Sequence, residues 1–192
     1  MALHRPANGA SVRFDLDDPR AVRHDDSGRS PAVRSLLPTV VLGRSVIDRL
    51  ENRMRDTGAA TLRACLHTRS DAALHDMLVF VARRAYAAPH KHERKDETYH
   101  LVRGTGLLLL FDDGGRVTSA ERLDVDGSLL ARVGAGQFHT LVPTSDCLVF
   151  HESRPGPFEP GGDSLFAPWA PPPADADRGS AWLERLVTDH SK

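Results

Sequence analysis

Short segments of strand-forming residues recur between residues 61 and 152, and turn sequences separate them. In the first segment Leu62, Ala64 and Leu66 alternate with other residue types, which is the pattern of a half-buried strand. The sequence Asp112-Asp113-Gly114-Gly115 lies between two such segments and predicts a hairpin. About eight short strands at this spacing predict an all-β sandwich or barrel, and the jelly roll is the eight-stranded form of that architecture.

Other elements are expected on either side of the barrel. A short helix is predicted from Ser45, where Ser-Val-Ile-Asp has the spacing of a capping box, to the Thr57-Gly58 pair. We expect a flexible N-terminal arm over 1–38, the barrel domain over 39–170, and a Pro/Ala-rich linker with a short C-terminal helix over 171–192. The expected strands cover residues 61–67, 77–88, 97–103, 107–111, 116–123, 129–133, 138–142 and 147–152, and the C-terminal helix covers 181–187.

Charge and hydropathy exclude several classes of partner. The 25 Lys and Arg are scattered among 26 Asp and Glu, so we expect no nucleic-acid partner. The longest strongly apolar run, Leu107 to Phe111, is far shorter than the roughly 20 residues that span a bilayer, so we expect no membrane insertion. The N-terminus has no apolar segment typical of a signal peptide, which favours the cytoplasm. Cys65 and Cys147 are interpreted as buried small hydrophobic residues.

Histidine spacing provides the chemical signal. His90 and His92 are two residues apart, so on a strand their imidazoles point to the same side. Glu97 has the wrong parity for one continuous strand with them, but the charged segment between can turn the chain. Glu97 would then lie on a neighbouring strand and face the two histidines.

A fourth ligand is expected from a later strand, because closing a barrel brings distant strands together. His139 follows the glycine-rich segment Gly134-Ala135-Gly136 and is the candidate. Three imidazoles and one carboxylate suit one divalent transition metal (Fe, Mn, Zn, Ni or Co) and suit calcium poorly. The alternative interpretation is that the histidines are solvated and that residues 91–97 form only a polar strand edge.

The metal-ligand pattern resembles the cupin superfamily. The spacing of His90, His92, Glu97 and Gly104 matches the first cupin motif, and Gly136 with His139 resembles part of the second. The resemblance implies a double-stranded β-helix (jelly-roll) barrel with these residues as metal ligands, so that 39–170 would be a cupin metal-binding domain. Two positions depart from the second motif, Gly134 where proline is usual and Pro143 where asparagine is usual, and neither is a ligand position.

A narrower resemblance, to the WbuC family of cupin-fold metalloproteins, runs from about Val41 to Pro171. The residues that carry it are Tyr86, Pro89-His90-Lys91-His92, Leu-Leu-Phe-Asp-Asp-Gly-Gly-Arg-Val at 109–117, Gly-Pro-Phe at 156–158 and Phe-Ala-Pro-Trp-Ala-Pro at 166–171. The resemblance implies a metal site and an association with bacterial surface-polysaccharide gene clusters. The family tends to place asparagine between Arg and His in an earlier strand, where this chain has Arg63-Ala64-Cys65-Leu66-His67.

Four further residues are candidates for binding a substrate. Arg84 and Tyr86 share strand parity with His90 and would point into the same cavity; alternatively, Tyr86 packs in the barrel and Arg84 lies at its rim. Arg63 and His67 share one strand face and could line the pocket. His151 and Glu152 are expected to pair with each other or with solvent, and a functional role is the alternative.

Two hypotheses of function follow. In the first, the protein is a metalloenzyme that acts on a small polar metabolite; the WbuC resemblance suggests a sugar or surface-polysaccharide precursor, and the catalytic residues and reaction stay unassigned. In the second, it is a non-catalytic module in which the metal stabilises the barrel or completes a small-ligand site. Because cupin barrels commonly form dimers, the resemblance also suggests that this protein is a homodimer.

Overall fold

Eight strands of the computed structural model, which describes residues 12–26, 30–159 and 161–190, pair in a nested order. The first of the eight pairs with the last (β4 with β11), the second with the seventh (β5 with β10), the third with the sixth (β6 with β9) and the fourth with the fifth (β7 with β8). This order defines a double-stranded β-helix, or jelly roll, and confirms the predicted all-β barrel. The strands are β4 Leu74–Ala82, β5 His90–Lys91, β6 Glu97–Arg103, β7 Thr105–Phe111, β8 Val117–Asp124, β9 Leu130–Val133, β10 Phe138–Pro143 and β11 Cys147–Pro155.

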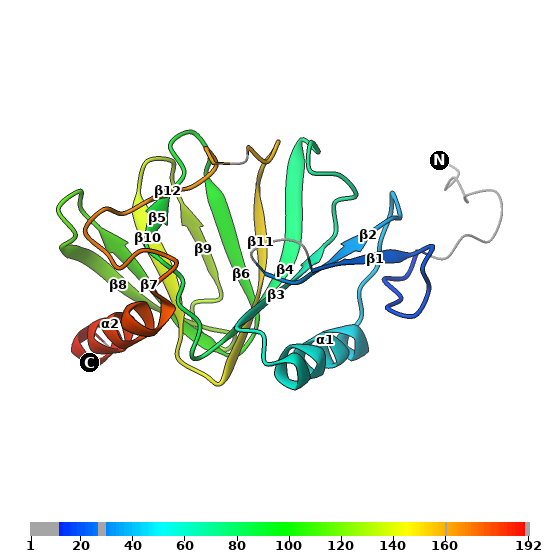
Figure 1. The fold of residues 1–192 in the computed structure, drawn as a ribbon, viewed down its shortest axis with the longest axis horizontal. Coiled ribbons are helices and arrows are strands. Elements are labelled where there is room, and N and C mark those ends of the chain that lie inside the picture. The colour runs from blue at the N-terminus through cyan, green and yellow to red at the C-terminus, as the bar shows by residue number, and fades with distance from the viewer. Residues whose placement is uncertain (1–11, 27–29, 160, 191–192) are drawn as a thin grey trace.

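Four additional strands extend the two sheets of the barrel. The seven-stranded sheet has the order β1-β2-β3-β4-β11-β6-β9, and the five-stranded sheet has the order β12-β5-β10-β7-β8. The added strands are β1 Val22–Asp25, β2 Ala32–Ser35, β3 Thr61–Cys65 and β12 Leu165–Phe166. One helix lies beside each sheet, α1 (Arg44–Thr57) near β3 and α2 (Ala176–His190) near β7 and β8 (Figure 1).

Alternation along the strands produces three hydrophobic clusters. Residues of one parity, such as Val79, Leu101 and Leu148, fill the barrel between the sheets. Residues of the other parity in the larger sheet, such as Phe80, pack against Ile47, Leu50 and Met54 of α1. On the smaller sheet, outward residues such as Leu109 pack against Leu183 and Trp182 of α2. Strand β7 is thus covered on both faces, which explains why the run over 107–111 is apolar at successive positions.

Helix α1 ends as predicted but begins differently. Gly58 terminates it in the left-handed conformation (φ 67°), where glycine carries no steric cost. The predicted capping box is wrong: the N-cap is Gly43, which has no side chain to accept a hydrogen bond, and Ser45 lies inside the helix. The amphipathic spacing of the buried residues therefore defines this helix more than its first turn does.

The two ends of the chain contain more regular structure than expected. Within the segment predicted as a flexible arm, the described residues include β1 and β2, and β2 pairs in parallel with β3. Phe14 is 1% exposed in the cluster beneath α1. Residues 1–11 and 27–29 of the predicted arm lie outside the described residues. Helix α2 starts at Ala176, five residues before its predicted beginning.

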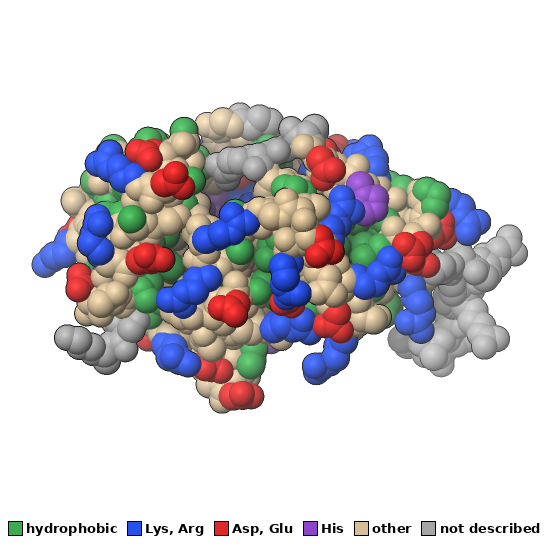
Figure 2. Space-filling view, turned by 60° about the horizontal axis from the view of Figure 1, so that its bottom comes forward, with side chains coloured by type: hydrophobic (Ala, Val, Ile, Leu, Met, Phe, Trp, Pro, Cys, Tyr) green, Lys and Arg blue, Asp and Glu red, His purple; other side chains and the backbone are tan. Residues whose placement is uncertain are grey.

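Acidic and basic side chains are mixed over the surface shown in Figure 2, in agreement with a formal net charge of −1. Among the described residues, no helix combines the length and the apolar character needed to cross a membrane.

Candidate metal centre

Three parts of the chain bring the predicted ligands to one end of the barrel. His90 lies on β5 and is the direct pairing partner of His139 on β10. Glu97 opens β6 in the opposite sheet, after the turn that the charged segment 93–96 makes. The backbone N–H of Gly136 donates to the His92 carbonyl at 2.8 Å, which ties the glycine-rich turn before β10 to the first pair of histidines.

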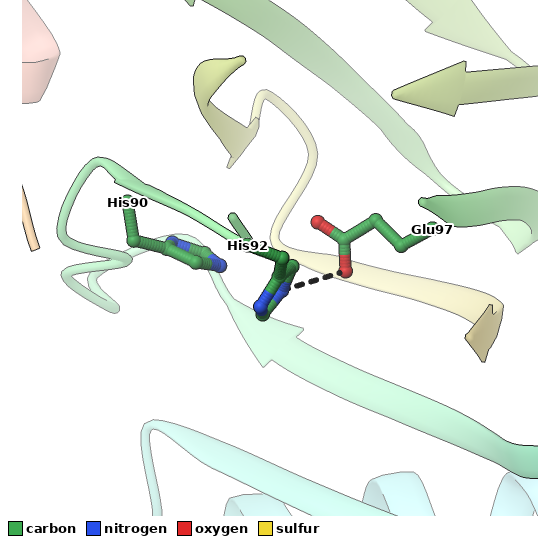
Figure 3. A group of neighbouring side chains, drawn as sticks. All are labelled: His90, His92 and Glu97. Carbon is green, nitrogen blue, oxygen red and sulfur yellow. Dashed lines mark ion pairs between the residues drawn. The ribbon is translucent and has the colours of Figure 1, made fainter. Parts of the chain in front are cut away.

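Three of the four predicted ligands form one group of donor atoms, and His139 lies beside this group. Donor atoms of His90, His92 and Glu97 all lie within 4.8 Å of one another, and Figure 3 shows the Glu97 carboxylate directed at the imidazoles. His92 Nε2 lies 3.4 Å from Glu97 Oε2. His139 joins the group through contact of its Nε2 with Glu97 Oε1, and its ring lies 4.7 Å from that of His90.

Backbone carbonyls orient all three imidazoles. His90 Nδ1 donates to Ala88 at 3.0 Å, His139 Nδ1 donates to Gln137 at 2.8 Å, and His92 Nδ1 donates to Asp163. A carbonyl only accepts hydrogen bonds, so each Nδ1 carries a proton, and each ring in its neutral form has its lone pair on Nε2. This arrangement of the outer hydrogen bonds is the one that metal-binding histidines use.

Burial and mutual interaction determine the charges of these groups. Burial, with the neighbouring His139, lowers the pKa of His90 to about 4, so the ring is neutral near pH 7. Burial alone would raise the pKa of Glu97, but His139 and His92 hold it well below its usual range. Burial alone would lower the pKa of His92, but the Glu97 carboxylate outweighs this effect and raises it. The carboxylate is ionised and available as a ligand.

The four residues fit a divalent transition metal by the chemistry of their donor set. Two or more Nε2 lone pairs beside a buried carboxylate repel one another unless a proton or a cation lies between them. His92, Glu97 and His139 are each at most 3% exposed, so water screens this repulsion poorly. Imidazole nitrogen and carboxylate oxygen are the ligands that iron, manganese, cobalt, nickel and zinc share.

A second layer of polar residues surrounds the candidate ligands. Tyr99 donates its hydroxyl hydrogen to Glu97 Oε1 at 2.5 Å. Arg154 approaches His92 Nε2 at 3.1 Å and Asp163 Oδ2 at 2.9 Å, the latter an ion pair without hydrogen-bond alignment. Lys95 pairs with the other oxygen of Asp163. These contacts hold the segment containing Asp163, whose carbonyl orients His92.

Sequence reasoning missed this layer, although strand parity contained the signal. On β11, Glu152 and Arg154 have the same parity as Leu148 and Phe150, which fill the barrel. Glu152 therefore points inward, and the expected pairing of Glu152 with His151 or solvent is wrong. His151 has the opposite parity, and its Nε2 lies 3.3 Å from Asp76 Oδ1.

Arg84 and Tyr86 are directed at the helices rather than at the candidate ligands. The parity argument for them is wrong because β4 ends at Ala82 and β5 begins only at His90. Arg84 donates to the Gly58 carbonyl at the end of α1, and Tyr86 donates to the Pro171 carbonyl. The Tyr86 ring belongs to the cluster between the smaller sheet and α2.

Arg63 and His67 lie nearer to the polar end of the barrel. Arg63 has the inward parity of Cys65 on β3, and its charge lowers the pKa of Glu152 against the dominant effect of burial. His67 stacks on His75 with ring centroids 4.2 Å apart, and His75 is the pairing partner of Arg154 across β4 and β11. Binding of a substrate by Arg63 or His67 stays a prediction.

The nested strands and the histidine-lined barrel end define a jelly-roll protein of the cupin type with a candidate metal centre. Residues 46–123 match the family described as "Domain of unknown function (DUF6016)". This match covers less than half of the chain and includes His90, His92 and Glu97 but not His139. No curated protein matches the sequence.

The chain is also similar, at low sequence identity, to parts of several solved structures. The capsular polysaccharide assembling protein CapF from Staphylococcus aureus is 16% identical over 54% of this chain and 29% of its own, with a TM-score of 0.47. KdgF from a Halomonas species is 21% identical over 52% of this chain and 81% of its own, with a TM-score of 0.41. Bacillus subtilis oxalate decarboxylase, described with Mn(II) centres, is 18% identical over 49% of this chain, with a TM-score of 0.41, and this chain spans 24% of its length.

Proposed function

We propose that the protein binds one divalent transition metal through His90, His92, Glu97 and His139 and is a metalloenzyme that acts on a small polar metabolite. The observation that supports the metal site best is the set of three imidazoles whose Nδ1 atoms all donate to backbone carbonyls while a buried carboxylate faces them. A bound ion would supply Lewis acidity or an activated water. The chain itself would orient the ligands and exclude bulk water.

The substrate class and cellular context rest on the resemblance to the WbuC family. That resemblance, based on residues between Val41 and Pro171, suggests a sugar or surface-polysaccharide precursor. Residues 39–170 would form the metal-binding domain, located in the cytoplasm, and a homodimer is part of the same proposal. Strand β12, which holds Phe166 of the family-like segment, pairs with His90 and so connects this segment to the site.

Elemental analysis tests the metal site. Protein purified without added metal is loaded with Mn²⁺, dialysed and analysed. We expect one ion per chain in the wild type, none in His139→Gln, and one in the matched control His100→Gln, because His100 is exposed on the outer face of β6. An empty wild type, or equal loading of the His139→Gln variant, would contradict the proposal.

Metal removal distinguishes an enzyme from a module with a structural ion. The three hydrophobic clusters that hold the barrel and helices together do not include the four ligands, so the metal-free protein should remain folded. Bound metal should then raise the free energy of unfolding only because it binds the folded state and not the unfolded one. This linkage gives about 2.7 kcal/mol when the free metal concentration is a hundred times Kd. Cooperative unfolding upon chelation, measured by circular dichroism, would favour the structural role instead.

A further inference from the structure

Arg154 occupies the side of His92 that a metal ion would need. Because His92 Nδ1 donates to the Asp163 carbonyl, the lone pair of its neutral ring is on Nε2. Arg154 Nη1 lies 3.1 Å from this atom and donates to it. The guanidinium is well buried, since only 13% of the side chain is exposed, and its Nε lies 3.6 Å from Glu152 Oε1.

A metal ion bound to His92 would take this acceptor away from Arg154. One lone pair cannot accept a hydrogen bond and bind an ion at the same time, so Nη1 would keep Asp163 but lose its bond to the imidazole. A guanidinium N–H that loses its partner in a buried site requires another acceptor. A ligand of the ion would offer such an acceptor beside the metal, in addition to the Asp163 carboxylate that Nη1 already faces.

The charges around the site favour an anionic ligand. Three basic and three acidic side chains interact in this part of the molecule: Arg63, Lys95, Arg154, Glu97, Glu152 and Asp163. Their formal charges cancel even when Glu152 is counted as ionised. A divalent ion then adds two positive charges that this group does not neutralise, and buried net charge is costly without a counter-ion.

We propose that Arg154 binds the carboxylate of a small acid that chelates the metal through a carboxylate oxygen and an adjacent hydroxyl oxygen. This inference rests on the proposed metal site and narrows its substrate class. Four protein ligands leave two positions on a six-coordinate ion, which suits a chelating α-hydroxy acid, and the planar guanidinium matches a carboxylate. Among sugar derivatives, the site would select sugar acids over neutral sugars.

Two probes of equal shape test the proposal: glycolate, which is an anion, and glycolamide, which is neutral. Both offer a hydroxyl and a carbonyl oxygen to a metal. Calorimetry on the Mn²⁺-loaded wild type should show at least about tenfold tighter binding of glycolate. In Arg154→Gln this preference should fall severalfold, to the part that the Mn²⁺ ion itself gives a carboxylate over an amide. Arg154→Lys should show an intermediate preference, because lysine keeps the positive charge but lacks the planar guanidinium.

Lys95→Gln is the matched control. It removes one positive charge from the same group, but Lys95 contacts Asp163 and the Pro157 carbonyl rather than His92. We expect it to keep most of the preference for glycolate, whereas an equal loss in Lys95→Gln and Arg154→Gln would mean that net charge alone attracts the anion. Water-proton relaxation of the bound Mn²⁺ provides an independent signal, because the chelating probe displaces coordinated water.

The possible outcomes separate this inference from the proposed function. A wild type that binds no Mn²⁺ contradicts the metal site itself. If the wild type binds Mn²⁺ and binds glycolate and glycolamide with equal affinity, the anion site is contradicted but the metal site is not. If Arg154→Gln fails to fold or to hold Mn²⁺, Arg154→Lys decides: a reduced preference for glycolate over glycolamide supports Arg154 as the anchor, and an unchanged preference with Mn²⁺ still bound overturns it.

Discussion

The two ends of the barrel interior are built by the same strands but have opposite chemistry. Along β11, the inward positions run from Leu148 and Phe150 to Glu152 and Arg154. On β6, the antiparallel neighbour of β11 in the same sheet, Leu101 pairs with Phe150 and Tyr99 pairs with Glu152, and Glu97 follows at the polar end. One end is therefore a hydrophobic core and the other a set of buried ionisable groups.

This contrast shows how strand alternation separates stability from function. Parity decides only that a side chain points inward, whereas its residue type decides whether it packs or binds. Buried charges contribute little net stability, so a chain that places several of them together at one barrel end uses them for something other than folding. The four experiments below test this division, from the largest expected effect to the smallest.

Truncation at the apolar end should have the largest effect on stability. Leu148 is 0% exposed, so Leu148→Ala should lower the free energy of unfolding by about 2–5 kcal/mol through lost burial and a residual cavity. Urea titration measures the loss, and Mn²⁺ stoichiometry of the folded variant should be unchanged. The control Leu130→Ala, at a position 61% exposed, should cost less than about 0.5 kcal/mol. Loss of metal binding in Leu148→Ala would show that the two ends are not independent.

Removal of one hydroxyl at the polar end should affect metal binding as well as stability. Tyr99→Phe deletes the hydrogen bond to the Glu97 carboxylate, so we expect about 1.5–3 kcal/mol lower stability without metal and about 10–100-fold weaker Mn²⁺ binding. The other tyrosine is a matched control, because the Tyr86 hydroxyl donates to a neutral carbonyl outside the barrel. Tyr86→Phe should leave Mn²⁺ affinity unchanged, and equal effects of the two variants would contradict the proposed division.

Neutralising Glu152 should stabilise the metal-free protein in a pH-dependent manner. Burial and, second to it, the nearby Glu97 carboxylate raise the pKa of Glu152 above its usual 4.5. Protonated Glu152 therefore contributes stability that is fully present below pH 4.5. This contribution is lost as the pH rises through the pKa of Glu152 in the folded state. Glu152→Gln mimics the protonated acid and should gain about 1 kcal/mol or more over the wild type at pH 7. Urea titrations at pH 4.5 and 7 measure the difference, which should shrink at the lower pH; a constant difference would argue against ionisation as the cause.

An ion pair outside the barrel should contribute least. Arg132 pairs with Asp96, but 65% of the Arg132 side chain is exposed. Arg132→Ala should therefore lower the free energy of unfolding by less than about 1 kcal/mol. Added salt should reduce this difference further, because it screens exposed charges. Thermal unfolding at low and high ionic strength measures it. A larger cost would mean that Asp96, which also accepts a hydrogen bond from Ala135 N–H before β10, orders the loop next to the site.

Most of the barrel could be predicted from local sequence because its strands alternate and its turns contain glycine and aspartate. The strand predicted over 97–103 coincides with β6, and the turn at 112–115 lies between β7 and β8 as expected. The strand predicted over 77–88 ran too far, since nothing in the pattern marks the end of β4 at Ala82. That error placed Arg84 and Tyr86 in the cavity, whereas Arg84 donates to the carbonyl of Gly58 just after α1 and the Tyr86 ring lies against Gly179 of α2.

The amino-acid sequence by itself determined the fold class and placed His90 and His92 on one side of a strand, because alternation and two-residue spacing are local properties of an extended chain. Glu97 and His139 were added to this pair by the cupin resemblance and by the expectation that the barrel closes. Tertiary structure decided which groups surround them. Arg154, Asp163 and Tyr99 reach the site only because nested pairing brings β6, β11 and the segment before β12 to the same barrel end. Contacts between residues that are distant in sequence depend on how the sheets close, and no local pattern contains that information.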